Sequence, residues 1–329
     1  MKIFHKYKAF LFLILPVLLL AQCVDNQHHK ELKLAHGLPV GHPVSKAMDF
    51  LAMRCKEISN GELTIKIYPS GQLGSEQQNV ELLQLGSLAM TKVSAAVLEG
   101  FSEDYKALGL PYIFRDKKHY FDVCDSDIGK DILLSTKDKW LRGLCFFDAG
   151  SRSFYATKKQ IKTPDDLKGM KIRVMKSKTA MNMVEALGGS PTPLSWGELY
   201  TALQSGVVDG AENNPPTFYN SHHFEVCKYY SLDEHASIPD VLIMSQWVWD
   251  QLSPKEQGYL QQAVNETVIK QRALWAAAEE EALGELKKAG VHIFKPDKTL
   301  FSEKVGPMYE SYQSQPVVYD YITRIKNLK

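Results

Sequence analysis

The sequence predicts an α/β protein that is divided into two lobes, and two observations lead to this fold class. Short stretches that alternate apolar and polar residues, as strands do, are separated by stretches with helical periodicity along most of the chain. About 300 residues follow an N-terminal leader, and a chain of this length can bury a large core and tends to form two lobes rather than one.

In the first part of the chain the 44–58 segment places Ala47, Leu51 and Ile58 on one helical face, and Asn60-Gly61 ends that helix. The strand after it alternates apolar Leu63 and Ile65 with polar residues. The elements expected here alternate in type: a strand at 32–36, a helix at 44–58, a strand at 63–69, a helix at 77–85 and a strand at 89–93.

The alternation resumes after Arg152. Pro164 and the acids after it are typical of a first helical turn, and Ser195 with Glu198 forms a capping box. Ser253 begins an Ala- and Glu-rich helical stretch that runs to about residue 289, longer than most helices of globular proteins. The elements expected here are a strand at 153–156, a short helix at 163–167, a strand at 171–174, a helix at 179–187, a helix from 195, a strand at 207–211 and the long helix.

This order of elements predicts parallel sheets with helices on both faces. In open sheets of this kind, ligands bind outside the carboxyl ends of the strands. Loops near Arg152, Arg173 and Asn213 would then line one wall of a cleft between the lobes.

Residues 1–22 are predicted to be a signal peptide, because three lysines precede an apolar run that is too short to span a bilayer. Leu20-Ala21-Gln22-Cys23 resembles a bacterial lipobox, which predicts lipidation of Cys23 and a polar tether at 23–30. Gln22 departs from the small residue expected before that cysteine. Cleavage near Ala21, which would leave a free soluble protein, is the alternative.

The charge balance excludes a nucleic-acid-binding protein. Without the leader's three lysines the chain has 36 basic residues against 38 acidic ones, a net charge of −2, and no basic stripe is interleaved with aromatic residues. Apart from Cys23, the cysteines, at 55, 124, 145 and 227, form no C-x-x-C pair and are interpreted as core thiols. His222-His223 lack a third ligand nearby, so no metal or other cofactor is expected.

Two arginines indicate a ligand with a carboxylate. Arg152 and Arg173 lie at or within strand-like stretches, where an arginine has no packing role, and Asn213 follows a third such stretch. A guanidinium offers two parallel donors that match a carboxylate. If the three side chains converge, the chain captures an organic acid. No catalytic triad, nucleophile elbow or phosphate loop is present, so a binder is favoured over an enzyme.

Over essentially the whole mature chain, the sequence resembles the solute-binding proteins of TRAP transporters, the tripartite ATP-independent periplasmic importers of organic acids. The matching segments, in order and at matching spacings, are 68–74 (Tyr-Pro-Ser-Gly-Gln-Leu-Gly), 110–112 (Leu-Pro-Tyr), 164–174, 204–213, 247–254 and the long helix that follows.

This resemblance implies a periplasmic-binding-protein-like fold of type II, with two α/β lobes, hinge strands between them and a long helix that braces both. The first lobe is expected to comprise 31–149 and 239–278, and the second 150–238 and 279–329. The protein would be a periplasmic monomer that closes over its ligand and delivers it to the TRAP membrane subunits. An ion gradient would drive the transport.

The resemblance also assigns roles at the site. Arg173 matches the position that forms a salt bridge with the ligand carboxylate, and Arg152 and Asn213 match positions that assist it. On the other lobe, the positions expected to select the ligand are His36, Glu76 and the strand around Lys92 and Ser94.

The stretches 90–95, 213–216 and 234–240 resemble the branch that binds hexuronates such as glucuronate and galacturonate. A uronate has one carboxylate for Arg173 and several hydroxyls, and the residues expected to bind those hydroxyls are Glu76, Lys92, Asn213, Asn214 and His235. Sialic acid is disfavoured because Ser94 stands where an acid would be expected nearby.

Three alternatives stay open at this point. A C4-dicarboxylate would need a second cation, for which Lys92 or Arg152 could serve. An exported enzyme that acts on uronates and a sensor that feeds a membrane receptor would use the same pocket.

Overall fold

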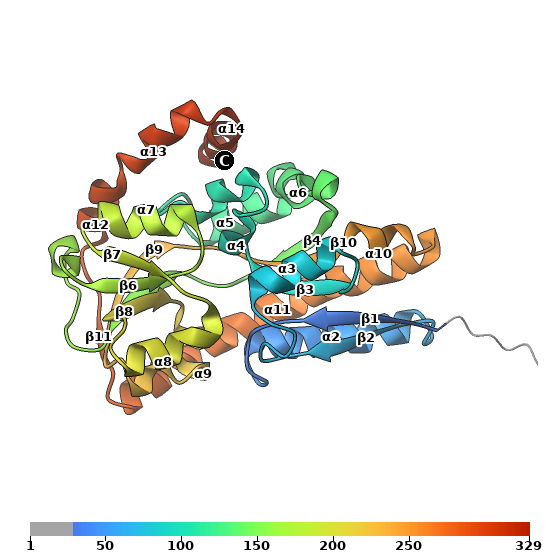
Figure 1. Cartoon of the computed structure of the whole chain (residues 1–329), viewed down its shortest axis with the longest axis horizontal. Helices are drawn as coiled ribbons and strands as arrows, with labels where there is room; N and C mark the ends of the chain where they lie inside the picture. The colour runs from blue at the N-terminus through green and yellow to red at the C-terminus, as the bar shows by residue number, and fades with distance from the viewer. Residues whose placement is uncertain (1–28) are drawn as a thin grey trace, which may run out of the picture.

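The computed structural model describes residues 29–329, which form two α/β lobes side by side (Figure 1). The predicted signal peptide, Cys23 and most of the predicted tether lie outside these residues. Lys30 was expected in the tether, but it begins strand β1 and pairs with Leu63.

The sheet of the first lobe has the order β2-β1-β3-β10-β4. Its strands are β1 (Lys30–Ala35), β2 (Leu63–Tyr68), β3 (Met90–Ser94), β4 (Leu141–Phe147) and β10 (Asp240–Ser245). β1 runs parallel to β2 and β3, as predicted, whereas β10 runs antiparallel to both β3 and β4. The reversal arises because β10 enters this sheet from the other lobe.

Helices cover both faces of this sheet. Along β10, Val241 and Ile243 belong to one core while Leu242 and Met244 belong to the other, since successive side chains of a strand point to opposite faces. The first core is covered by α3 (Glu76–Gln84), α4 (Ala95–Leu98), α5 (Lys117–Asp125) and α6 (Asp127–Leu134), and the second by α2 (Pro43–Ile58) and the first half of α11 (Pro254–Lys288).

The sheet of the second lobe has the order β11-β9-β5-β8-β6-β7. Its strands are β5 (Arg152–Ala156), β6 (Lys171–Val174), β7 (Ser190–Pro193), β8 (Gly210–Asn213), β9 (Tyr229–Ala236) and β11 (His292–Phe294). On β5, Phe154 packs in a core with α7 (Lys178–Ala186) and α12 (Lys298–Val305), and Tyr155 in a core with α8 (Leu199–Gln204) and α9 (Pro215–Asn220). β5 runs antiparallel to β8 and β9, so this sheet is also mixed.

Before the C-terminal stretch, three segments connect the lobes. The chain crosses from β4 to β5 and returns from β9 to β10, and α11 runs along both lobes (Figure 1). Val264 of α11 packs in a first-lobe core and Leu286 in a second-lobe core, so the helix braces both lobes as the family resemblance implied.

The C-terminal segment differs from the predicted lobe boundary. Residues 279–329 were expected in the second lobe, and Phe301 of α12 does pack there. The chain then continues through α13 (Met308–Ser311) to α14 (Pro316–Asn327), whose buried Val318, Ile322 and Ile325 belong to a first-lobe core. The apolar stripe of α14 is buried mainly against the 3-10 helix Glu103–Gly109 and α6, so this helix packs on the first lobe.

Candidate functional site

A cleft between the lobes encloses about 770 Å³ of space, including the solvent at its mouth. The polar residues that line it from the first lobe are Ser75, Glu76, Gln77, Lys92, Ser94 and Asp240. Those that line it from the second lobe are Arg152, Arg173, Lys176, Ser195, Asn213, Asn214 and Thr217, together with Trp196.

Arg173 lies in the middle of β6 and is 2% exposed. Its Nε and Nη2 both donate to the carbonyl oxygen of Leu194, at 3.0 and 2.8 Å, and its guanidinium lies 5.8 Å from the ring of Trp196. Within residues 29–329, Nη1 has no hydrogen-bond partner and no carboxylate forms an ion pair with this side chain. Burial lowers the pKa of Arg173, and its positive charge stays uncompensated by direct contact.

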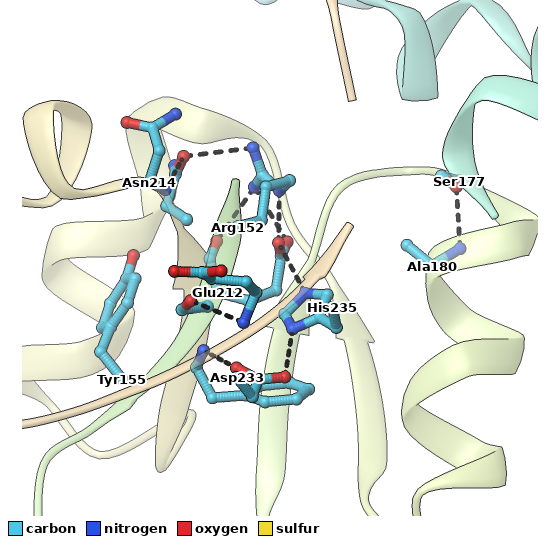
Figure 2. A network of polar contacts seen from close by, with 12 residues as sticks. Arg152, Tyr155, Ser177, Ala180, Glu212, Asn214, Asp233 and His235 are labelled. Carbon is cyan, nitrogen blue, oxygen red and sulfur yellow. Dashed lines mark hydrogen bonds and ion pairs between the residues drawn. The ribbon is translucent and has the colours of Figure 1, made fainter. Parts of the chain in front are cut away.

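Arg152 has a different environment, although it lines the same cleft. Its Nε and Nη2 donate to the carboxylate of Glu212, and Nη2 also donates to the carbonyl oxygen of Glu212 (Figure 2). Its Nη1 donates to Oδ1 of Asn213 at 3.1 Å. These bonds use four of the five N–H donors of the guanidinium, which leaves one N–H for a ligand. The carboxylate of Glu212 neutralises the charge of Arg152, and the bonds hold its side chain in place.

The two asparagines are fixed by their oxygens. Oδ1 of Asn213 accepts from Arg152 and from the backbone N–H of Asn214, and Oδ1 of Asn214 caps α9 by accepting from Thr217. In both residues the amide Nδ2 is therefore the atom available to a ligand.

His235 was predicted to line the cleft, but it is not among the residues that line it. Its ring instead lies beside Glu212 and Asp233 (Figure 2). Its Nδ1 is 2.7 Å from the carboxylate of Asp233, and its Nε2 is 3.6 Å from that of Glu212. Asp233 and His235 flank Glu234, which has a φ of +49°, in a stretch where β9 is bulged against β5. His235 thus extends the chain of ion pairs away from the cleft.

We expect His235 to make stability fall at alkaline pH. Burial opposes the charged ring, but the carboxylates of Asp233 and Glu212 outweigh it and raise the pKa of His235 from 6.5 to about 9. A raised folded-state pKa gives stability that is complete below pH 6.5 and is lost as the pH rises through 9. The free energy of unfolding, measured at pH 6 and 9.5, should fall more in the wild type than in His235→Gln. Equal pH dependence in both proteins would contradict this.

On the first-lobe wall, Lys92 lies between two carboxylates. Its Nζ is 2.9 Å from Glu76 Oε1 and 3.2 Å from Asp240 Oδ1, and the other oxygen of Glu76 accepts from the backbone N–H of Ser94. Burial disfavours the charged amine, but the two carboxylates raise the pKa of Lys92 above its usual value. Two negative charges surround one positive charge, so this wall carries a net negative charge and several acceptor oxygens.

His36 was predicted to select the ligand from this wall, but it does not line the cleft. His36 follows the end of β1 and lies two residues after Leu34, so its side chain is on the same face of the sheet as that of Leu34. Its ring is fully buried there. Neither ring nitrogen has a partner among the described residues. Burial, and then the charge of Lys92, lower its pKa to about 4 and keep it neutral. The next two residues, Gly37 and Leu38, line the cleft instead.

Sequence reasoning missed two acids of the site, although both had a signal. Asp240 precedes the apolar run of β10, and Glu212 follows an apolar run and precedes two asparagines. An acid inside a strand-like stretch has as little packing role as an arginine there, and each of these carboxylates pairs with a predicted cation.

The described residues also bear on the predictions for the cysteines, for metal binding and for membrane spans. Cys55, Cys124, Cys145 and Cys227 are buried free thiols, as predicted. In residues 29–329 no cluster of three potential metal ligands occurs, and no helix is long and apolar enough to cross a bilayer.

Comparison with known proteins places these features in a family. The family of bacterial extracellular solute-binding proteins, family 7, matches residues 34–315. The chain is 36% identical to the protein YiiZ of Salmonella typhimurium, over 97% of this chain and 98% of that protein.

Two solved structures are similar along nearly their full length. A TRAP periplasmic solute-binding protein from Xanthobacter autotrophicus with bound β-D-galacturonate is 39% identical, with a TM-score of 0.88 over 91% of this chain and all of that one. One from Pseudomonas putida with bound D-glucuronate is 35% identical, with a TM-score of 0.87 over 91% of this chain and 98% of that one.

Proposed function

The chain belongs to family 7 of the bacterial extracellular solute-binding proteins and is a TRAP solute-binding protein, and we propose that its ligand is a hexuronate, D-glucuronate or D-galacturonate. This family consists of binding proteins and not of enzymes. The protein would capture the sugar acid in the periplasm and deliver it to the TRAP membrane subunits. The predicted signal peptide and the lipidation of Cys23 stay predictions.

One observation carries the proposal: Arg173 is buried at the cleft with a donor that has no partner and a charge that no described carboxylate pairs with. A buried charge is costly unless it is paired. A ligand carboxylate at Nη1 would supply both the missing acceptor and the missing charge. Arg152, which Glu212 already neutralises, would add its remaining N–H to the same group.

The distribution of charge favours a sugar acid over a C4-dicarboxylate. Lys92 is the cation of the first-lobe wall that could hold a second carboxylate, but Glu76 and Asp240 already surround it. A second ligand carboxylate would meet their repulsion. Sugar hydroxyls, in contrast, can donate to these carboxylates and accept from the amides of Asn213 and Asn214.

The solved relatives support the same ligand class, because those from Xanthobacter autotrophicus and Pseudomonas putida hold galacturonate and glucuronate. These two proteins hold different epimers, so the proposal covers both D-glucuronate and D-galacturonate.

A ligand panel tests the proposal. We expect at least one of D-glucuronate and D-galacturonate to bind with one-to-one stoichiometry, to raise the melting temperature and to be recovered unchanged. D-Glucuronamide, which keeps the shape and loses the charge, and its galacto counterpart should bind at least about 100-fold more weakly, because a charged hydrogen bond and an ion pair are lost. Calorimetric titration gives the affinities. Tighter binding of succinate or sialic acid than of either hexuronate would contradict the proposal.

A further inference from the structure

A second hollow opens directly outside the ligand cleft. We call the cleft described above the inner chamber and this hollow the outer chamber. The outer chamber encloses about 1210 Å³, again with solvent at its mouth, against about 770 Å³ for the inner one. Residues that line the outer chamber and not the inner one include Ser70, Gln78, Glu81, Gly197 and Glu198.

The two chambers are continuous. Both are lined by Gly37 and Glu76 of the first lobe and by Trp196 of the second. A Cβ atom placed on Gly37 would stand 3.7 Å from Cδ1 of Trp196, so these two residues form a narrowing between the chambers. Arg173 lines the inner chamber and not the outer one. A ligand carboxylate that binds Arg173 therefore lies away from the outer chamber.

The outer chamber suits a neutral polar group and not a second acid. Glu76, Glu81 and Glu198 bring three carboxylates to it, against the single positive charge of Lys176. Carboxylates accept hydrogen bonds from hydroxyls, and they repel another carboxylate. Gln78 and Ser70 add further polar groups, while Trp196 adds an aromatic ring, a surface on which sugars can pack.

We propose that the outer chamber is a subsite for a neutral sugar joined to the anomeric carbon of the bound uronate, so that the ligand class includes disaccharides with a uronate at the non-reducing end. This inference rests on the proposed function. The anomeric carbon is the position through which a uronate at a non-reducing end is joined to another sugar, and the ring oxygen separates it from the carbon that carries the carboxylate. A substituent on the neighbouring 4-hydroxyl would instead lie close to Arg173.

Two disaccharides test the subsite, one for each epimer: glucuronosyl-α-1,2-xylose and galacturonosyl-α-1,2-rhamnose. Calorimetric titration of the full mature protein compares each with its own monosaccharide. We expect the disaccharide of the bound epimer to bind within tenfold of that monosaccharide, and digalacturonate, which brings a second carboxylate, to bind more weakly than the galacturonosyl disaccharide. A disaccharide more than tenfold weaker than its monosaccharide overturns the inference.

Gly197 offers a variant that blocks the outer chamber alone. Its added Cβ would meet no atom within 4 Å, so the side chain of Gly197→Phe starts in open space. The variant should weaken the disaccharide at least tenfold and leave the monosaccharide unchanged. Gly258→Phe, at an equally open glycine of α11 outside both chambers, is the matched control and should change neither affinity. Equal weakening of both ligands by Gly197→Phe contradicts the subsite, whereas failure of both monosaccharides to bind the wild type contradicts the proposed function itself.

Discussion

Replacing Arg173 by alanine is expected to abolish hexuronate binding and to leave the ligand-free protein about as stable as the wild type. The loss of binding should reach about 1000-fold, or about 4 kcal/mol, because a charge-assisted pair is removed and the ligand carboxylate stays buried without a counter-charge. The free protein loses two bonds to the carbonyl oxygen of Leu194. It also loses a buried charge that no described carboxylate compensates, and the two changes oppose each other.

Calorimetric titration measures the first effect and thermal unfolding without ligand measures the second. Arg173→Lys keeps the charge but loses the planar fork, so it should still bind far more weakly than the wild type. Lys171→Ala is the matched control, since this exposed lysine lies on the same strand as Arg173 but outside the cleft and should change affinity little. Hexuronate binding by Arg173→Ala within tenfold of the wild type would show that the carboxylate is held elsewhere.

The fold was largely predictable because its elements are local in sequence. The capped start of α11 at Ser253 and the alternation in β2 depend on neighbouring residues, and the structure confirms both. The mixed direction of the sheets was not predictable in the same way, because it depends on which sheet a crossing strand joins. The position of α14 likewise depends on an apolar surface that distant segments assemble.

The site was predictable where a residue type conflicted with its local setting. Arg173 in a short apolar strand has no packing role, and this conflict identified it without the fold. For His36 and His235 the neighbouring sequence did not indicate where the side chain points, since a side chain near the end of a buried strand can point into either the core or the cleft. The family resemblance already made Arg173 the anchor and Arg152 its assistant, but the reason that Arg152 is neutralised needed the structure, because it depends on which of them Glu212 reaches.

The second large effect is on stability: Arg152→Ala should destabilise the protein by about 3–5 kcal/mol. Glu212 is 2% exposed, and Arg152 is the main group that holds the pKa of its carboxyl at about 2 despite burial. Removal of the arginine leaves a buried carboxylate whose remaining cation, His235, is 3.6 Å away and shared with Asp233. Breaking one side of a buried ion pair has a cost of this order.

Urea denaturation of the ligand-free protein measures this loss, with Arg324→Ala as the matched control. Arg324 also pairs with a carboxylate, Asp131, but both side chains are substantially exposed, so its removal should cost less than about 1 kcal/mol. Adding Glu212→Gln to Arg152→Ala should recover part of the loss, because the unpaired buried charge is then gone. If Arg152→Ala costs no more than Arg324→Ala, the buried chain from Arg152 through Glu212 to His235 does not stabilise the second lobe. Arg152 would then have to be explained by ligand binding alone.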